Sequence, residues 1–460
     1  MTGEHLAVID IGKTNAKLAV VRRSDLSEID VVTRPNTVLP GPPYPHFDVD
    51  GHWEFILDGL SRFNAEHGLT AITITTHGAA AALLSEDGSL AAPVLDYEHT
   101  GPDACAEAYD AIRPLFLETG SPRLSMGLNL GAQLHWQFLT DPTLLNRVAH
   151  VVTYPQFWAH RLTGVLATDV TSLGCHTDLW NPHERRFSSL PEALGIADRI
   201  APPRKPGDVL GTITTEIARR TGLSTATPVL CGIHDSNASL LAHLMRRDPP
   251  FSVVSTGTWV IAMTVGGKPM TLDPARDTLV NVNAFGDAVP SARFMGGREH
   301  DLLLGGSATR ADEADMREIL TDHRMLLPAV VPETGPFAGM TSRWVGDEPP
   351  PASGQRSAAV GFYLALVTAR CLELIGHEGP VIVEGPFARN TPYLVMLEAA
   401  SASPVVPTTS ATGTSAGAAL LLATPGTPDR EATHRPMCDA HLRDLCVDYA
   451  SVWDAALRGA

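Results

Sequence analysis

A carboxylate between an apolar segment and a helical one is the first residue of this chain that suggests chemistry. Residues 228–244 read PVLCGIHDSNASLLAHL, which predicts a strand over 229–233 and a helix that begins near Asp235. A carboxylate held at such a point can act as a general base and accept a proton from a substrate. The same position suits an ordinary residue that caps a helix, so this segment alone leaves both interpretations open.

Asp10 ends another apolar segment and precedes a loop that is suited to binding an anion. Residues 6–11 and 16–22 each predict a strand, and the loop at 12–15 (GKTN) offers backbone N–H groups and hydroxyls. Asp10 could hold a hydrated Mg²⁺ beside it. The letters GKT do not form a P-loop, because Ala7 occupies a position that requires glycine and a strand follows the loop. A plain β-hairpin turn remains the alternative.

A second strand–loop–strand segment opens the C-terminal half of the chain. Residues 251–254 and 259–265 predict strands, and the loop between them reads STGT. Two such segments, one at the start of each half, indicate a duplicated domain with a cleft between the copies. The matched pair favours a nucleotide that is held from both sides.

His77 follows a third expected strand, at 71–75, and precedes Gly78. A histidine beside a glycine at the end of a strand can donate a hydrogen bond to a sugar hydroxyl with little steric obstruction. An isolated histidine is more often structural, and this alternative stays open. Asp96, Tyr97 and His99 follow the next short strand and form a polar cluster that could line the same cleft.

Two strand–turn–helix segments lie close together near the C-terminus. Residues 381–383 predict a buried strand that leads through Glu384-Gly385-Pro386-Phe387 to a helix, and residues 411–415 (ATGTS) open a helix of small residues. Such segments can seat an adenosine, because small residues let the base approach the backbone. A close-packed pair of helices is the alternative.

Length and composition predict two large domains in a globular chain. The 460 residues exceed what one hydrophobic core usually fills, and the charged, proline-bearing segment at 246–250 marks the expected boundary. With 44% hydrophobic and 18% charged residues, the chain has no apolar run of membrane-spanning length. The formal charge of −17 argues against a nucleic-acid or anionic-membrane partner.

Cysteine usage and the N-terminus predict a reducing compartment, with the cytoplasm as the default. The six cysteines are scattered without a zinc-type spacing, so we expect free thiols. Cys438, His441 and Cys446 lack a nearby fourth ligand and a standard spacing, which argues against a metal site there. Residues 1–5 lack the basic region of a signal peptide.

Six motifs in a fixed order resemble those of the FGGY family of carbohydrate kinases. They are DIGKTN, THG, GIHDSN, STGTW, EGPFARN and ATGTSAG, and they cover residues 6–423. HDS and STGTW look most like the branch that phosphorylates L-rhamnulose and L-fuculose. The resemblance implies an α/β fold of two actin-like, ribonuclease H-like domains, at 1–247 and 248–460, with ATP and Mg²⁺ in the cleft between them. It implies that the domains close around a small sugar substrate.

The resemblance also implies roles for individual residues. Asp235 falls on the catalytic aspartate and Asp10 lies near the metal. Expected near the phosphates are Gly12, Lys13, Thr14, Asn15, Lys17, Thr256, Gly257 and Thr258. Expected near the adenosine are Gly385, Asn390 and Gly413. Expected to contact the sugar are Trp53, Glu54, His77, Gly78 and His234.

One departure and two alternatives accompany the resemblance. Relatives commonly carry a run of glycines where this chain has Pro386 and Phe387, which predicts a reshaped adenine seat. A pentulose or polyol kinase of the same family is one alternative, and an actin-like ATPase without a metabolic substrate is the other. We expect no nucleic-acid or membrane partner, and we leave a homodimer open.

Overall fold

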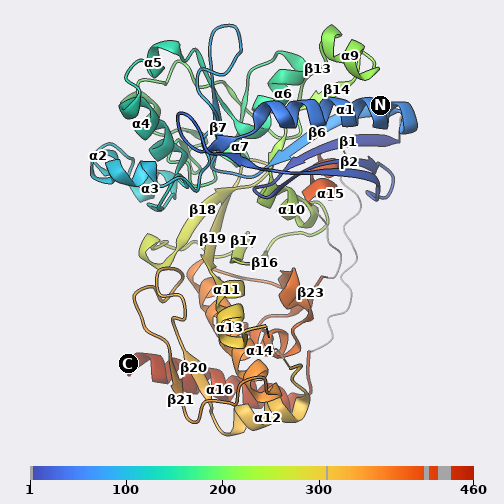
Figure 1. Ribbon diagram of the computed structural model, residues 1–460. Coiled ribbons are helices and arrows are strands. Elements are labelled where there is room, and N and C mark those ends of the chain that lie inside the picture. The colour runs from blue at the N-terminus through green and yellow to red at the C-terminus, as the bar shows by residue number, and fades with distance from the viewer. Residues whose placement is uncertain (1–3, 307–308, 409–413, 423–436, 460) are drawn as a thin grey trace. The chain divides into compact units, whose positions relative to one another are not determined.

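The computed structural model describes residues 4–306, 309–408, 414–422 and 437–459 (Figure 1). By its internal contacts the chain divides into two compact units. The first unit comprises Met1–Arg246, Val280–Ala288 and Thr412–Thr427, and the second comprises Arg247–Leu279, Val289–Ala411 and Pro428–Ala460. Two short segments from the C-terminal half therefore belong to the first unit. The division into domains at residue 247 remains a prediction.

The first unit is built on a sheet of seven strands in the order β13-β14-β6-β1-β2-β3, with β15 also paired to β6. The strands β1, β2 and β3 are antiparallel neighbours, whereas β6, β14 and β15 run parallel. The central strand β1 is apolar at successive positions because both of its faces are covered. The strands are β1 His5–Ile11, β2 Asn15–Arg22, β3 Glu28–Pro35, β6 Leu69–Thr76, β13 Val209–Thr212, β14 Pro228–Leu230 and β15 Ile233–His234.

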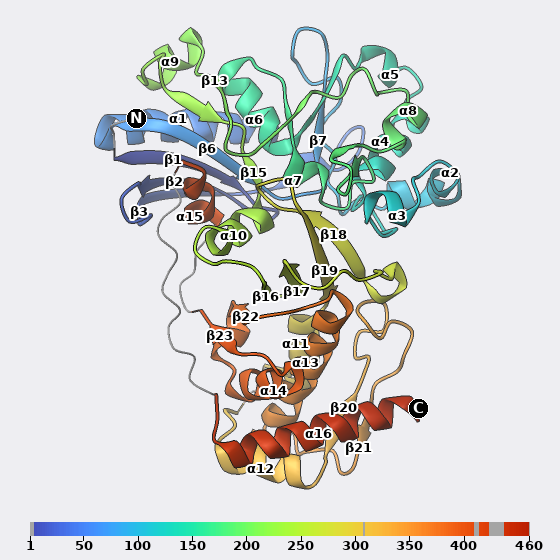
Figure 2. The same cartoon turned by 180° about the vertical axis from the view of Figure 1, so that it is seen from behind.

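Alternation along β1 decides which helices each side chain meets. Ala7, Ile9 and Ile11 pack in the core formed with α1 (Val49–His67) and α6 (Tyr154–Thr163). Leu6 and Val8 pack in the core on the other face, with α10 (Asp235–Leu244) and α15 (Thr414–Ala419). Both views show these two helix pairs on opposite faces of the sheet (Figures 1 and 2). By the same alternation, Asp10 belongs to the face of α10 and α15.

The second unit repeats this strand arrangement. Its sheet has the order β18-β19-β17-β16-β22-β23. The strands β19, β17 and β16 are antiparallel neighbours, and β22 and β23 continue the sheet in parallel, as β6 and β14 do in the first unit. The repetition expected from the two strand–loop–strand segments is therefore present. The strands of this sheet are β16 Phe251–Thr256, β17 Val260–Val265, β18 Thr278–Val282, β19 Ala288–Phe294, β22 Val381–Glu384 and β23 Val405–Pro407, of which residues 280–282 and 288 belong by their contacts to the first unit.

The helix α13 (Gly354–Leu374) forms the centre of the second unit's core. Ser353 caps its N-terminus by accepting from the N–H of Arg356 at 3.1 Å. It packs against α14 (Thr391–Ser401), and α16 (Ala440–Arg458) packs on α14 in turn. Among the described helices, only α13 is long and apolar enough to cross a membrane, and 72% of the window that passes this test is buried inside the structure. This burial is what a core helix shows.

The remaining elements connect the main strands and helices of each unit. In the first unit they are β4 Val38–Leu39, β5 His46–Phe47, β7 Ala81–Leu84, η1 Gly101–Cys105, α2 Ala106–Asp110, α3 Phe116–Thr119, α4 Leu130–Thr140, α5 Leu144–Arg147, β8 His150–Thr153, β9 Thr168–Asp169, α7 Val170–Leu173, β10 Trp180–Asn181, β11 Arg186–Phe187, α8 Leu190–Ala193, β12 Pro203–Arg204, α9 Thr215–Thr221 and η4 Leu420–Leu422. In the second unit they are η2 Pro274–Arg276, α11 Gly296–Leu304, α12 Glu313–Thr321, β20 Met325–Leu327, β21 Arg343–Val345 and η3 Pro386–Arg389.

Candidate active site

The ends of three parallel strands bring the main candidate residues together in the first unit. In the register of the sheet, Asp10 of β1 is the partner of Thr75 in β6, and Thr76 is the partner of His234 in β15. His77 follows Thr76 and Asp235 follows His234, so these two residues lie side by side just beyond the ends of neighbouring strands. Strand register thus joins three residues that lie far apart in the sequence.

Asp10 is a buried carboxylate that is held by hydroxyls and by a lysine. Its Oδ2 accepts hydrogen bonds from the hydroxyl of Thr414 and, at 3.4 Å, from that of Ser415, both at the start of α15. Lys17, its register partner on β2, places Nζ 3.6 Å from the same oxygen. Burial raises the pKa of Asp10, and the nearby charge of Asp235 raises it further.

Asp235 is the first residue of α10 and keeps part of its carboxylate open. Its Oδ1 accepts from the N–H of Ser236 at 2.6 Å and from the Ser236 hydroxyl at 3.3 Å. The side chain is 29% exposed. Burial raises the pKa of this carboxyl, whereas His77 opposes the rise. Because Oδ1 accepts both of these hydrogen bonds, Oδ2 is left to accept a hydrogen bond from a substrate.

His234 positions the Asp235 carboxylate through a defined tautomer. Its Nε2 lies 3.1 Å from Asp235 Oδ1, and its Nδ1 lies 3.2 Å from the side-chain amide nitrogen of Asn237. The amide donates to Nδ1, so the proton of the neutral ring belongs on Nε2, which also lies 3.7 Å from Cys175 Sγ. Burial lowers the pKa of His234 to about 4, which keeps the ring neutral at pH 7. A Cβ on Gly78 would lie 2.8 Å from His234 Nε2, so glycine leaves the space for this ring.

His77 offers a free lone pair beside Asp235. Its Nδ1 lies 2.8 Å from the carbonyl oxygen of Gly78 and donates to it, which leaves Nε2 as an acceptor. Nε2 is buried, and no hydrogen-bond partner for it occurs in the part of the chain that the structure describes. Burial lowers the pKa of His77 to about 4, so the ring is neutral. The geometry suits acceptance of a hydrogen bond from a substrate hydroxyl, the reverse of the donation expected from the sequence.

Aromatic rings surround His77. The ring centroids of Phe47, Tyr97 and Tyr154 lie 4.8, 5.3 and 5.1 Å from that of His77. Of these, only Tyr97 belonged to the cluster expected from the sequence. Phe47 and Tyr154 carry no motif, and no local signal in the sequence could have assigned them to the site.

Lys13 is engaged by acidic residues and not by Asp10. Its Nζ forms an ion pair with Asp96 and another, 3.1 Å long, with Glu98. It also lies 4.8 Å from the centre of the Tyr97 ring and 5.4 Å from that of Phe47. The sequence placed Lys13 with the phosphate-binding residues, whereas the structure places it with the aromatic residues around His77.

The other residues of the first loop form a tight turn. The N–H of Gly12 donates to the carbonyl of Asn15 at 2.9 Å, and Asn36 binds the loop through the carbonyls of Gly12 and Thr14, each at 2.8 Å. The side chains of Thr14 and Asn15 are exposed. This is compatible with the expected contact to phosphates, and it is equally the geometry of a plain hairpin.

Trp53 and Glu54, which were expected to contact the sugar, have other contacts in the structure, and their role at the sugar stays a prediction. Trp53 stacks on Trp158 with ring centroids 6.4 Å apart, and the guanidinium of Arg161 covers it at 4.4 Å. The side chain of Glu54 is 67% exposed, and its closest cation is Arg220 at 3.7 Å. Both project from α1, whereas the aromatic neighbours of His77 come from β5, from a loop and from the first residue of α6.

The second unit contains a separate pocket of about 800 Å³. Its lining includes Gly257 and Thr258 from the β16–β17 loop, together with His300 of α11. Phe387 and Asn390 line it from the segment that follows β22. Several residues expected near the nucleotide therefore share one cavity.

Local contacts explain how the segments around this pocket are held. The hydroxyl of Thr256 donates to the carbonyl of Glu384 and accepts from the N–H of Phe387 at 3.1 Å. Gly385 has φ 81° and lies so close to Thr256 that a Cβ would overlap with its carbonyl oxygen. Asn390 caps α14 by accepting from Tyr393 N–H at 3.1 Å. Gly413 lies outside the described residues.

The departures at Pro386 and Phe387 take a specific form. Phe387 is buried, with its ring 5.1 Å from that of Tyr393 and 5.7 Å from that of His300. The added bulk is therefore largely absorbed by packing inside the second unit, and one edge of it lines the pocket.

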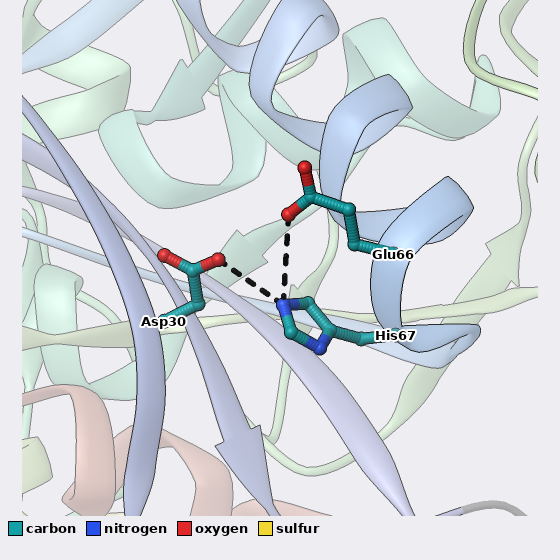
Figure 3. A group of neighbouring side chains, drawn as sticks. All are labelled: Asp30, Glu66 and His67. Carbon is teal, nitrogen blue, oxygen red and sulfur yellow. Dashed lines mark hydrogen bonds and ion pairs between the residues drawn. The ribbon is translucent and has the colours of Figure 1, made fainter.

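One group of potential metal ligands lies elsewhere in the described chain, at Asp30, Glu66 and His67 (Figure 3). His67 Nε2 lies 3.1 Å from Asp30 and 3.8 Å from Glu66. Arg62 pairs with Asp30 at 3.1 Å and already supplies the positive charge that these carboxylates require. We interpret the group as an ion-pair cluster.

Asp10 suits a magnesium ion better. Its carboxylate is close enough to Asp235 for the charge of one to raise the pKa of the other, and oxygen ligands of this type are the ones that Mg²⁺ prefers. Thr414 and Lys17 bind only Oδ2 of Asp10 in the described structure, which leaves Oδ1 for a metal or its bound water. The residues present therefore fit the ion.

Comparison with known proteins adds the family. The model of the FGGY family of carbohydrate kinases, N-terminal domain, matches residues 5–242, and that of the carbohydrate kinase FGGY, C-terminal domain, matches residues 248–431. L-fuculokinase of Salmonella typhi is 28% identical over 276 residues, which are 58% of each chain. Rhamnulokinase of Bacteroides thetaiotaomicron is 25% identical over 263 residues, 56% of this chain and 54% of that relative. The chain thus spans little more than half the length of the curated relatives that it matches.

A solved structure covers the whole chain. A carbohydrate kinase from Novosphingobium aromaticivorans is 37% identical, with a TM-score of 0.92 and complete coverage of both chains. The predicted fold class, an α/β protein with two actin-like, ribonuclease H-like domains, is thereby confirmed. The expected resemblance to the L-fuculose and L-rhamnulose branch is also confirmed.

Proposed function

This chain belongs to the FGGY family of carbohydrate kinases, and we propose that it transfers the γ-phosphate of ATP to a hydroxyl of a ketose such as L-rhamnulose or L-fuculose. The observation that carries the proposal is the pair formed by Asp235 and His77. A carboxylate with an open oxygen lies beside a buried ring nitrogen that has a free lone pair. A polyhydroxyl substrate can donate one O–H to each of them.

In the proposed mechanism Asp235 is the general base. It accepts the proton of the attacking hydroxyl while that oxygen forms the new bond to phosphorus and the bond to ADP breaks. His234 Nε2 lies 3.1 Å from Oδ1, so the ring packs against that oxygen and leaves the other carboxylate oxygen for the substrate. His77 accepts a hydrogen bond from a second hydroxyl and orients the sugar. Neither histidine exchanges a proton near pH 7, because burial lowers both pKa values to about 4.

The phosphates require positive charge and N–H donors, because charge stabilisation dominates phosphoryl transfer. Lys17 beside Asp10 supplies one cation in the first unit. Mg²⁺, when bound by Asp10 and its neighbours, would neutralise charge on the phosphates. The loop of Thr256, Gly257 and Thr258 and the residues Gly385, Asn390 and Gly413 are proposed to bind the rest of the nucleotide.

The reaction needs the attacking oxygen and the phosphorus about 3–3.5 Å apart. Closure of the protein on both substrates would meet this need and would also keep water from being phosphorylated. We propose that the enzyme acts in the cytoplasm on a free sugar.

Asp235→Asn tests the proposal. Asparagine keeps the shape and accepts the same N–H of Ser236, but it is not a base, so we expect kcat to fall by about 10²- to 10⁴-fold with sugar binding retained. The assay couples ADP release to NADH oxidation over a panel of ketoses, pentuloses and polyols. Activity that is the same with and without every panel compound would instead indicate an actin-like ATPase. Near-normal turnover of the variant would show that Asp235 is not the base.

A further inference from the structure

We propose that Lys13 and Asp96 bind hydroxyl groups of the substrate, and that the carboxylates around them restrict this site to uncharged polyhydroxyl compounds and exclude sugar acids. The inference rests on the proposed function, because it concerns the acceptor of the same reaction. It assigns Lys13 to the sugar and not to the phosphates.

The position of Lys13 is the first argument. Its side chain is 23% exposed and that of Asp96 is 9% exposed, so the ion pair is mostly shielded from water. The Nζ lies above the rings of Tyr97 and Phe47, which both also contact His77. The ammonium, two aromatic faces and the free lone pair of His77 therefore belong to one contiguous group within the first unit.

The hydrogen-bonding capacity of the pair is the second argument. An ammonium has three donors, and in the described structure Asp96 and Glu98 take two of those of Lys13. Asp96 Oδ1 accepts from Lys13 and from the N–H of Glu98 at 3.2 Å, which leaves Oδ2 as an acceptor. A hydroxyl can accept from the free ammonium donor and donate to Oδ2 at the same time. A carboxylate can only accept, so it cannot satisfy both.

The charge balance is the third argument. Asp96 and Glu98 bring two negative charges to this group, and Lys13 brings one positive charge. His77 and His234 are neutral, so an excess of one negative charge remains before Asp235 and the metal near it are counted. With an effective dielectric constant of about 20, one uncompensated like charge about 6 Å away weakens binding of an anion roughly 100-fold. A sugar acid would meet this repulsion, whereas a ketose would not.

The contrast with Lys17 is the fourth argument. Lys17 lies at Asp10, the carboxylate that we propose for the metal and phosphate side of the reaction. Each lysine pairs with two carboxylates, Lys13 with Asp96 and Glu98 and Lys17 with Asp10 and, at 2.9 Å, with Glu28, so the two differ in their position and not in their remaining charge. The two lysines of one hairpin therefore serve two substrates.

Steady-state kinetics of Lys13→Met and Lys17→Met, measured separately against ATP and against the best sugar of the panel, test the first part. We expect Lys13→Met to raise the sugar KM about 10- to 100-fold and to leave the ATP KM within about twofold, because it removes a charged hydrogen-bond donor. Lys13→Arg keeps the charge and should recover part of the loss. Lys17→Met should act on the ATP KM or on kcat. Unfolding temperatures of all variants check that they are folded.

Inhibition by D-gluconate against the same sugar tests the second part. We expect the wild-type protein to bind D-gluconate at least about 100-fold more weakly than its sugar. Glu98→Gln removes one negative charge and should reduce this ratio of affinities about tenfold. A rise of the ATP KM with an unchanged sugar KM in Lys13→Met would overturn the inference and leave the proposed kinase activity standing. Equal affinity for D-gluconate and the sugar would overturn it as well. If no panel compound gives ADP, the proposed function fails and the inference fails with it.

Discussion

Gly78→Ala perturbs the active site by a known and small displacement. The added Cβ would lie 2.8 Å from His234 Nε2 and 3.3 Å from Cys175 Sγ, whereas ordinary contacts begin near 3.4 Å. The backbone of Gly78 does not require glycine, because it lies outside the left-handed region. The substitution therefore acts only by pushing the His234 ring about 0.6 Å away from Gly78.

That displacement predicts a larger effect on catalysis than on folding. Overpacking of this kind costs about 1–3 kcal/mol of the free energy of unfolding. His234 Nε2 lies 3.1 Å from Asp235, so its shift moves the proposed base. Because a misplacement of about 1 Å can cost about 100-fold in rate, a shift of half that size should lower kcat about tenfold.

The assay is kcat with saturating ATP and sugar, together with the unfolding temperature. Gly207→Ala is the matched control, because its Cβ would have its nearest neighbour at 3.6 Å and Gly207 has no left-handed φ. We expect the control to match the wild-type protein in both measurements. Unchanged kcat and stability in Gly78→Ala would refute the argument that this glycine positions His234.

Three further predictions concern pH and the nucleotide. The kcat/KM profile should fall on the acid side at a pH above 3.8, because burial raises the pKa of Asp235. Asp235→Asn should abolish this acid limb. If the variant retained the acid limb, the limb would belong to another group. Burial raises the pKa of Asp169 to about 6, so the stability that its neutral form provides is complete below pH 3.8 and is lost as pH rises to about 6, a change of up to about 3 kcal/mol. Asparagine also caps a helix and does not ionise, so urea unfolding should show the stability of Asp169→Asn rising relative to wild type between these two pH values. A stability difference between variant and wild type that does not depend on pH would contradict this. Thr256→Ala removes one hydrogen bond to Glu384 and one from Phe387. Calorimetry should show that an ATP analogue binds more weakly by about 1–2 kcal/mol. An unchanged affinity would show that Thr256 does not shape the pocket.

Local patterns in the sequence were sufficient for most of the fold. Each strand–loop–strand segment rests on neighbouring residues, and both are present with the same strand order in the two units. Long-range register was not accessible in the same way. The pairing of Thr76 with His234 joins His77 to Asp235 across more than 150 residues, and no local pattern encodes it. The resemblance to a family supplied that contact in advance.

The contacts that the sequence missed share a physical cause. Phe47 and Tyr154 reach His77 from a two-residue strand and from the start of a helix, and their burial depends on how loops fold over the sheet. Trp53, which was expected at the sugar, also stacks on Trp158, a partner that the sequence did not indicate. Aromatic residues gain free energy from any large apolar contact, so their partners follow from the whole tertiary structure and not from spacing.

Lys13 illustrates how a motif can leave the role of one of its residues open. The GKT letters lie in a loop that is suited to anions, and this favoured a phosphate for each of its residues. A lysine side chain is long and flexible, however, and its ammonium can form an ion pair with any carboxylate within its reach. Here the ammonium forms ion pairs with Asp96 and Glu98, which lie about 80 residues away in the sequence. We propose that Lys13 positions acceptor groups around the sugar and that Lys17, whose register partner is Asp10, serves the phosphates. Kinetic separation of the two lysines would therefore divide the sugar side of this hairpin from its phosphate side.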